Sequence, residues 1–169
     1  MQVRPATISD AQTIARIHVA SWQAAYRGQM PDDFLNKLDV EKRAVFWRSR
    51  LTGQPRGVFV AELDSEIMGF CDLIPSRDKD TNPQTVAEIA AIYIHPNHWR
   101  QGAGRALCHR ALETARLENF SAVTLWALAS NTAARSFYET MGFRLDGATK
   151  TDLISHNHEL HHVRFQISV

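Results

Sequence analysis

The chain has 169 residues, of which 44% are hydrophobic and 22% charged, which suits one compact globular domain over residues 1–169. Lysines and arginines number 19 against 18 acidic residues, so the net charge of +1 provides no broad field for nucleic acid or an anionic membrane. Because the sequence shows no signal-peptide pattern and no apolar run of about 18 residues, we expect a cytoplasmic protein. Cys71 and Cys108 lie in apolar segments, which favours reduced buried thiols over a disulfide.

The hydrophobic pattern predicts alternating strands and helices. In the first half, the expected elements are a strand at 3–7, a helix at 9–28, a second helical region in two pieces at 31–38 and 40–51, and a hairpin at 57–74. In the second half, they are a nearly all-apolar strand at 85–96, a helix at 102–118, a strand at 121–129, a helix at 131–142, and a last pair of strands at 143–149 and 160–168. This order predicts an α/β domain with a mixed sheet.

Two glycines one residue apart, Gly102 and Gly104, stand between a buried strand and a predicted helix. A helix N-terminus leaves N–H groups unpaired, and its dipole favours an anion, so the stretch is either a phosphate cradle or only a tight turn. A nucleotide triphosphatase loop would need Lys and then Ser or Thr after Gly104, where Arg105 and Ala106 stand. A dinucleotide-binding fingerprint would need a third glycine in place of Leu107.

Residues 99–104, WRQGAG, resemble the pyrophosphate loop of the Gcn5-related N-acetyltransferase (GNAT) superfamily, Gln/Arg-x-x-Gly-x-Gly/Ala after a central strand. A later segment is similar to the second signature of that family, and its matching residues are Asn131, Ala134, Phe137, Tyr138, Gly142 and Phe143. The resemblance covers nearly the whole chain and implies a mixed, mostly antiparallel central sheet flanked by helices, with a splayed central strand pair. Trp99 departs from the usual Gln or Arg, but the loop binds mainly through backbone N–H groups, so we expect binding to survive.

The resemblance implies acetyl-coenzyme A as cosubstrate. Its pyrophosphate would lie on N–H groups of the loop, and its pantetheine arm would pair with the central strand like an added strand. Asn131 would bond the arm or cap a helix, and the arginines would reach phosphates or stay solvated. The expected cosubstrate-binding residues are Ile92, Tyr93, Ile94, Arg100, Gln101, Gly102, Ala103, Gly104, Arg105, Asn131 and Arg135.

Two side chains match catalytic positions of the family. Glu88 matches a glutamate that some members use as general base, and we expect partial burial to raise its pKa; alternatively it faces solvent or pairs with an arginine. Tyr138 matches a tyrosine that donates a proton to the departing sulfur, and otherwise it is a core residue. The N–H of Ile92 or its neighbour would polarise the thioester oxygen. No cysteine nucleophile is needed, because neither cysteine has a clear base partner in the sequence.

The acceptor side is the least determined part of the sequence. The resemblance places it at residues 22–35, with Trp22, Tyr26 and Phe34 as apolar walls. Asp32 and Asp33 would attract a cationic amine, or they only begin a helix. His156, His158, His161 and His162 suggest a metal site, but alternating histidines are more simply a polar strand face, so we expect no metal.

The sequence therefore predicts an N-acetyltransferase that transfers acetyl directly to a primary amine of a small molecule in a ternary complex. A protein or peptide N-acetyltransferase, acting on N-termini or lysines, is the alternative enzyme. A non-catalytic acyl-coenzyme A sensor is the alternative from another class, although the presence of Glu88 and Tyr138 argues against it. The sequence leaves open whether the chain forms a homodimer.

Overall fold

One seven-stranded sheet organises the chain in the computed structural model, which describes residues 1–53, 56–155 and 158–169. The strands are β1 (Gln2–Pro5), β2 (Val58–Leu63), β3 (Glu66–Pro75), β4 (Val86–Ile94), β5 (Ala122–Leu128), β6 (Arg144–Ser155) and β7 (His158–Ser168). They lie in the order β1-β2-β3-β4-β5-β7-β6, and every neighbouring pair except β4 and β5 is antiparallel. The mixed, mostly antiparallel sheet expected from the sequence is confirmed.

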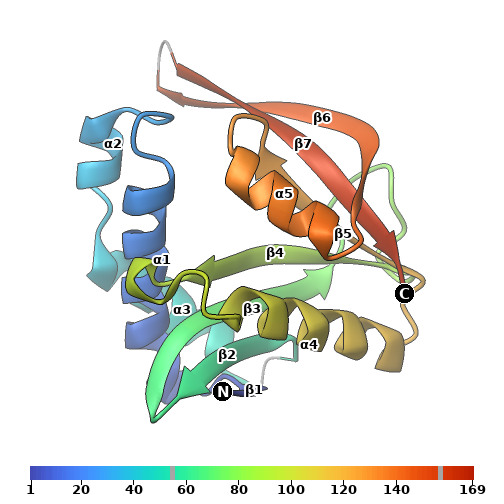
Figure 1. The fold of residues 1–169 in the computed structure, drawn as a ribbon, viewed down its shortest axis with the longest axis horizontal. Coiled ribbons are helices and arrows are strands. Elements are labelled where there is room, and N and C mark those ends of the chain that lie inside the picture. Colours follow the sequence, from blue (N-terminus) through green and yellow to red (C-terminus); the bar gives the residue numbers. More distant parts are fainter. Residues whose placement is uncertain (54–55, 156–157) are drawn as a thin grey trace.

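Helices cover both faces of this sheet (Figure 1). The helices are α1 (Ala11–Ala25), α2 (Asp32–Asn36), α3 (Val40–Leu51), α4 (Ala103–Leu117) and α5 (Thr132–Thr140), with short 3₁₀ turns η1 (Ile8–Asp10) and η2 (Pro96–His98). Polar side chains cap two of the longer ones: Asp39 accepts from the N–H groups of Glu41 and Lys42 at the start of α3, and Asn131 caps α5.

The two faces have separate cores. On one face, Ile14 of α1 and Trp47 of α3 pack with Phe70 of β3, all fully buried. On the other, Leu107 of α4 packs in one cluster with Phe143 and Phe165. Because successive residues of a strand point to opposite faces, β2, β3 and β4 each supply side chains to both cores. No helix in the described part of the chain is long and apolar enough to cross a membrane.

The sheet divides between β4 and β5. The two strands pair in parallel only from Val86–Ala122 to Glu88–Thr124, although β4 continues to Ile94 and β5 to Leu128. Beyond Glu88 the strands diverge, while β4 stays paired with β3 and β5 with β7. The splayed central pair predicted from the sequence is confirmed.

The C-terminal hairpin is longer than its sequence pattern predicts. Strand β6 runs to Ser155 instead of ending near residue 149, and β7 begins at His158 instead of residue 160. The residues of the two extensions pair with each other, as in Leu153 with Glu159 and Ser155 with His158. Cross-strand pairing between distant segments extends strands whose own hydrophobic alternation is weak.

Candidate active site

The glycine-containing loop adopts a backbone that few residue types favour. After η2, Arg100 has a φ of 62° and Gly102 a φ of 89°, both in the left-handed region, and α4 begins at the next residue, Ala103. Glycine adopts this region without a side-chain clash, whereas arginine does so at a cost of about 1 kcal/mol. The two left-handed residues turn the chain abruptly from the end of β4 into the first turn of α4.

This turn leaves a row of N–H groups free. Among the described residues, the backbone N–H groups of residues 100 to 105 have no hydrogen-bond acceptor, and the first amide bonded back to this loop is Ala106, which donates to the Gly102 carbonyl at 3.0 Å. Free N–H groups at the positive end of a 15-residue helix form a site for an anion. The backbone therefore has the form of the phosphate cradle expected from the sequence.

The neighbouring edge of β4 is also open. His95 donates to the Met68 carbonyl of β3, so strand alternation directs the N–H and C=O groups of Tyr93 to β3 and those of Ile92 and Ile94 to the opposite edge. Strand β5 has already diverged there. The expectation that all three residues pair with an extended ligand is therefore corrected for Tyr93, whose backbone groups serve the sheet and whose ring stacks on His18.

One group on this open edge is already bonded. The Ile94 carbonyl accepts 2.8 Å hydrogen bonds from the Ser21 hydroxyl of α1 and from the Trp99 indole N–H. The Trp99 side chain, which is 45% exposed, thus ties the loop to the end of β4 at the position where its sequence departs from the family pattern. Two donors occupy the two lone pairs of a carbonyl, so the N–H and C=O of Ile92 and the N–H of Ile94 remain for a ligand.

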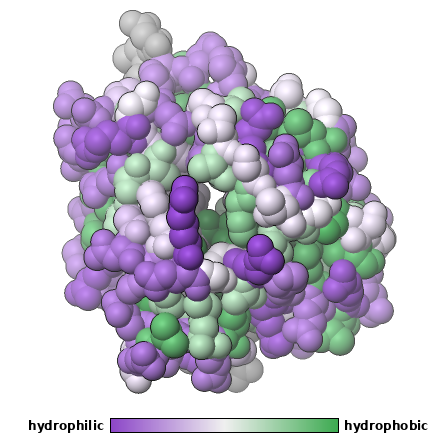
Figure 2. Space-filling model, in the orientation of Figure 1, coloured by the Kyte–Doolittle hydropathy of each residue, from purple (hydrophilic) through white to green (hydrophobic). Residues whose placement is uncertain are grey.

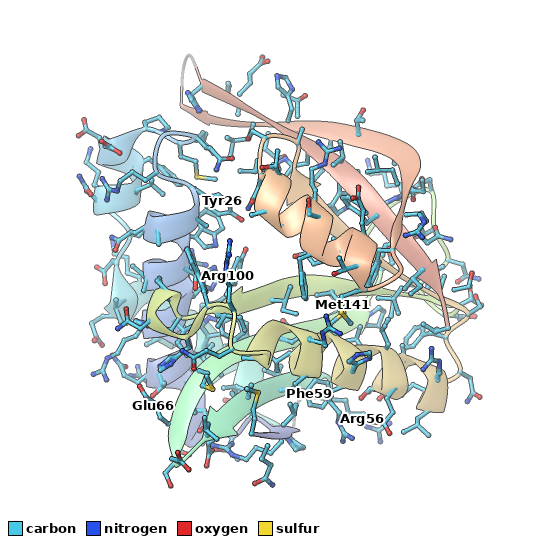
Figure 3. All side chains as sticks on the ribbon, in the orientation of Figure 1. Tyr26, Arg56, Phe59, Glu66, Arg100 and Met141 are labelled. Carbon is cyan, nitrogen blue, oxygen red and sulfur yellow. The ribbon has the colours of Figure 1, made fainter. Side chains whose placement is uncertain are left out.

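Three polar side chains expected at the cosubstrate site are engaged elsewhere. The Asn131 side-chain oxygen accepts from the Ala134 N–H, so Asn131 has the helix-capping role. Arg135 donates to the Ala129 carbonyl, and Gln101 folds back to donate to the Asn97 carbonyl. By contrast, Arg100 and Arg105 are exposed. The Arg100 side chain extends from the loop into the gap between α1 and α5 (Figure 3), where the surface is hollowed over an apolar floor (Figure 2).

Tyr138 of α5 is buried in the core cluster that also contains residues of β4 and β5, the two strands that part at this gap. Its ring packs against Phe137, Phe143 and Phe165 at centroid distances of 5.4, 6.1 and 5.8 Å. Burial, followed by the neighbouring phenol of Tyr93, raises the pKa of Tyr138 far above its usual range. The hydroxyl therefore stays protonated near neutral pH and is available as a proton donor.

A third phenol belongs to the same group. Burial raises the pKa of Tyr26, at the end of α1, and the nearby phenols of Tyr93 and Tyr138 raise it further. The phenols of Tyr93 and Tyr138 thus influence the Tyr26 hydroxyl, and Tyr26 is seen at the rim of the gap (Figure 3).

Glu88 differs from its expected state. Its side chain is 3% exposed, lies opposite the core face of Ala87 and Ile89, and is bound by Arg77 of the β3–β4 connection. The Arg77 Nε donates at 3.1 Å, its Nη2 at 2.5 Å and its backbone N–H at 3.2 Å. Burial alone would raise the pKa of Glu88, but the Arg77 hydrogen bonds and charge outweigh it and leave the pKa below its usual value. The expected rise is therefore wrong, and the arginine-pairing alternative is the one found.

The three aromatic residues expected to line the acceptor side lie in one cluster. Trp22, Tyr26 and Phe34 pack around a small core whose buried members are Met30, Leu35, Leu128 and Leu160. The Trp22 and Tyr26 rings meet edge to face at 5.3 Å. Asp32 and Asp33 begin α2 and are exposed, and Asp32 pairs with Arg27, which matches the helix-start interpretation.

The described histidines of the histidine-rich segment make contacts with other protein groups. His158 bonds the Gln29 carbonyl at 3.0 Å, His161 bonds the Thr151 hydroxyl, and His162 lies 3.4 Å from Asp152. His156 lies outside the described residues. Within residues 1–53, 56–155 and 158–169, no group of three His, Cys, Asp or Glu side chains could hold a metal ion.

Two residues of the site are absent from the sequence-based set. Arg77 reaches Glu88, and Ser21 reaches Ile94. Each contact joins different elements, so it depends on strand register and helix placement. The chain carries no local motif for either residue. Tyr93 was expected for its backbone, and its phenol beside that of Tyr26 was not predicted.

Comparison with known proteins agrees with this geometry. A model of the acetyltransferase (GNAT) family matches residues 15–143. An uncharacterized N-acetyltransferase, YuaI, of Bacillus subtilis is 35% identical over 130 residues, which cover 76% of this chain and 72% of the relative. An uncharacterized N-acetyltransferase of Archaeoglobus fulgidus is 30% identical, covering 85% of this chain and 93% of the relative.

Solved structures share the fold across the whole chain. The acetyl-coenzyme A complex of yncA, a putative acetyltransferase of Salmonella typhimurium, has a TM-score of 0.74 at 23% identity and covers 99% of this chain and 93% of that one. The PaiA N-acetyltransferase of Thermoplasma acidophilum, solved with coenzyme A, has a TM-score of 0.72 at 19% identity and covers 99% and 98%.

Proposed function

Because the chain belongs to the acetyltransferase (GNAT) family, we propose that it transfers an acetyl group from acetyl-coenzyme A to a primary amine of a small molecule. One observation carries the proposal. The open edge of β4, with free backbone groups at Ile92 and Ile94, runs directly into a loop whose N–H groups from residue 100 to 105 are free. An extended amide-bearing arm that ends in a pyrophosphate fits both features at once.

The residues present fit that cosubstrate. The N–H groups of residues 100 to 105 would hold the pyrophosphate, and the free groups of Ile92 and Ile94 would pair with the pantetheine amides. A Cβ on Gly104 would make ordinary van der Waals contact with the Phe137 ring at 3.5 Å and with Ile94 at 3.8 Å, so Gly104 lies where β4, α4 and α5 meet. Exposed Arg100 and Arg105 would add charge-assisted contacts to phosphate oxygens. The Salmonella and Thermoplasma structures, which hold acetyl-coenzyme A and coenzyme A, support this cosubstrate.

The chemistry is direct attack of a neutral amine on the thioester carbonyl. The Ile92 N–H, on the open edge, would stabilise the negative charge that develops on the carbonyl oxygen. Tyr138 would donate its proton to the sulfur as the carbon–sulfur bond breaks: its raised pKa keeps the proton on the phenol in the resting site, and burial also raises the basicity of the thiolate that forms beside it. The proton that the nitrogen loses on forming the amide then restores the phenol through solvent. Cys71 and Cys108 are buried, and burial raises both thiol pKa values, which suits no covalent role.

The proton of the attacking ammonium needs a different route from the one expected. Glu88 is already ionised and its oxygens are occupied by Arg77, which makes it a weak base near neutrality. We assign Glu88 a positioning role, in which its pair with Arg77 holds the β3–β4 connection against β4. The acceptor then loses its proton to solvent before attack, so the rate follows the fraction of neutral amine.

A small acceptor is favoured over a peptide by the contacts at the end of α1. The Gln29 side chain accepts from the Ser130 hydroxyl at 2.7 Å, and the Gln29 carbonyl lies 3.0 Å from the His158 Nε2. The connection between α1 and α2 therefore contacts both the β5–α5 turn and β7, where an extended peptide would otherwise need an open groove. The catalytic interpretation is favoured over a sensor by the protonated phenol of Tyr138, which is buried in the same cluster as residues of the parting strands β4 and β5.

Release of free thiol from acetyl-coenzyme A tests this function. The purified chain is incubated with a panel of small primary amines, lysine-containing peptides and peptides with free N-termini. Turnover with small amines supports the proposal, and preferential turnover with peptides supports the alternative enzyme. Tight coenzyme binding by calorimetry without turnover on any acceptor would indicate a sensor.

A further inference from the structure

Gln29 lies at the centre of contacts that join α1 to the far half of the sheet. Its Nε2 donates to the Ala25 carbonyl at 2.9 Å in the last turn of α1. Its Oε1 accepts from the Ser130 hydroxyl at 2.7 Å, in the turn between β5 and α5. Its backbone carbonyl contacts the His158 Nε2 at the start of β7. We call Gln29 with these three partners, Ala25, Ser130 and His158, the Gln29 bridge.

Apolar contacts of the neighbouring residue also hold the Gln29 bridge in place. Met30, next in the chain, is buried with Leu128 of β5 and Leu160 of β7. The Met30 N–H also bonds the Tyr26 carbonyl at 2.8 Å, which holds this segment close to the end of α1. Several individually weak contacts therefore act together to fix one geometry of this segment.

The bridge spans the gap in which the reaction is proposed to take place. Helix α1 carries Trp22 and Tyr26, the aromatic wall on one side, and α5, which follows the Ser130 turn, carries Tyr138 on the other. The sheet does not join these two sides, because β4 and β5 part after Glu88 and Thr124. The position of the Ser130 turn relative to α1 is therefore set at this end by the Gln29 bridge.

From this arrangement we infer that Gln29 is a specificity-determining residue that limits the size of the acceptor amine. It does so by holding the aromatic wall of α1 at a fixed separation from the Tyr138 side of the gap. The inference rests on the proposed acetyl transfer. The acceptor class that it selects is a compact primary amine with an apolar or aromatic body, which matches Trp22 and Tyr26, and it excludes bulkier amines and peptides.

The experiment compares Gln29→Ala and Ser130→Ala with wild type on a series of primary amines of increasing size. We expect both variants to raise kcat/KM for the largest amines relative to the smallest by roughly 10-fold, mainly through KM, which corresponds to about 1.4 kcal/mol. Gln23→Ala is the matched control, because Gln23 donates to the Leu35 carbonyl at 3.1 Å and joins α1 only to α2. We expect Gln23→Ala to keep the wild-type size profile, that is, the dependence of kcat/KM on the size of the amine.

A second measurement is independent of turnover. Hydrogen exchange of the Met30 amide, which is bonded to Tyr26, rises in Gln29→Ala and stays unchanged in Gln23→Ala, while calorimetry shows equal coenzyme affinity in all variants. Faster exchange with an unchanged size profile overturns the inference and leaves acetyl transfer intact. If wild type acetylates no amine of any size, the proposed function itself fails. Unchanged Met30 exchange shows that Gln29 does not hold the bridge, and this also overturns the inference.

Discussion

Arg77 holds Glu88 by three donors: two nitrogens of its guanidinium and its own backbone N–H. The carboxylate is 3% exposed, whereas the Arg77 side chain is 65% exposed, so the pair joins a buried acceptor to a partly solvated donor. This relationship decides how the protein responds to loss of the Glu88 charge.

We expect Glu88→Gln to lower the free energy of unfolding by about 1–2 kcal/mol at neutral pH, because the charged hydrogen bonds to Arg77 are lost. The loss stays this small because exposed Arg77 regains water when its partner is neutral. The pKa of Glu88 is lowered in the fold, so its contribution is present above the ordinary pKa and is lost as pH falls through the folded value. Denaturant unfolding measures this effect.

For activity, wild type and Glu88→Gln share one rising pH limb set by the acceptor amine. Loss of a separate limb in the variant would restore Glu88 as the base.

Tyr138→Phe tests the proton donor. The described residues supply no hydrogen-bond partner to the Tyr138 hydroxyl, so its removal leaves the aromatic packing with Phe143 and Phe165 in place. We expect turnover to fall roughly 10²-fold or more, with little change in coenzyme affinity or in the melting temperature. Steady-state kinetics, calorimetry and thermal unfolding check the three quantities. Equal turnover would make Tyr138 a core residue only.

Substitutions at the two loop glycines test coenzyme binding and backbone strain separately. A Cβ at Gly104 makes only ordinary contacts, with Phe137 and Ile94, so Gly104→Ala folds well, and Gly104→Val weakens acetyl-coenzyme A binding severely by filling the path of the arm. At Gly102 the φ of 89° penalises any side chain, so Gly102→Ala loses about 1 kcal/mol of stability, although nothing lies within 4 Å of its Cβ. Calorimetric titration and denaturant unfolding of the three variants distinguish the effects. Unchanged affinity in a folded Gly104→Val would reduce the glycines to a turn.

His18 of α1 predicts a pH-dependent stability. Its Nδ1 accepts from the Trp47 indole N–H at 3.3 Å, and burial, aided by the charge of Arg43, lowers the pKa of His18 to about 3. The unfolded chain binds a proton at this residue below pH of about 6.5, whereas the folded chain does not until about 3, so stability falls as pH drops through that range. At pH of about 5 the loss approaches about 2 kcal/mol.

The control for this prediction is His18→Gln, which keeps an acceptor for Trp47 without a titrating ring. Denaturant unfolding of both proteins between neutral pH and pH of about 5 compares their slopes. The variant is less stable at neutral pH, because it loses the ring stacking on Tyr93, but its stability changes less with pH. Parallel slopes would show that another group carries the acid sensitivity.

The sequence predicted most elements because their signals are local. The left-handed turn at Asp64 and Ser65, with φ values of 50° and 67°, joins β2 and β3 where the turn residues stand, and the glycine loop joins β4 to α4 as expected. Strand ends were less predictable. The extensions of β6 and β7 depend on their pairing with each other, which no single segment records.

The residues of the site also divide into those whose state the sequence predicts and those whose state it does not. Positions fixed by backbone form, such as Gly102 and the free amides after it, follow from the loop sequence. The state of Glu88 does not, because its pKa depends on Arg77, which the strand register of β3 and β4 brings beside it. Asn131 shows a third case, in which one side chain had two suitable roles and the fold uses the helix cap.

The parting of β4 and β5 after three residue pairs also has a thermodynamic meaning. A ligand that fills the gap contacts both halves of the sheet, and it substitutes for part of the ladder that the two strands do not form. Because such a ligand binds the folded chain and not the unfolded one, coenzyme at free concentration [L] raises the free energy of unfolding by RT ln(1 + [L]/Kd). The thermal stability of the protein is therefore expected to rise with the concentration of its cosubstrate.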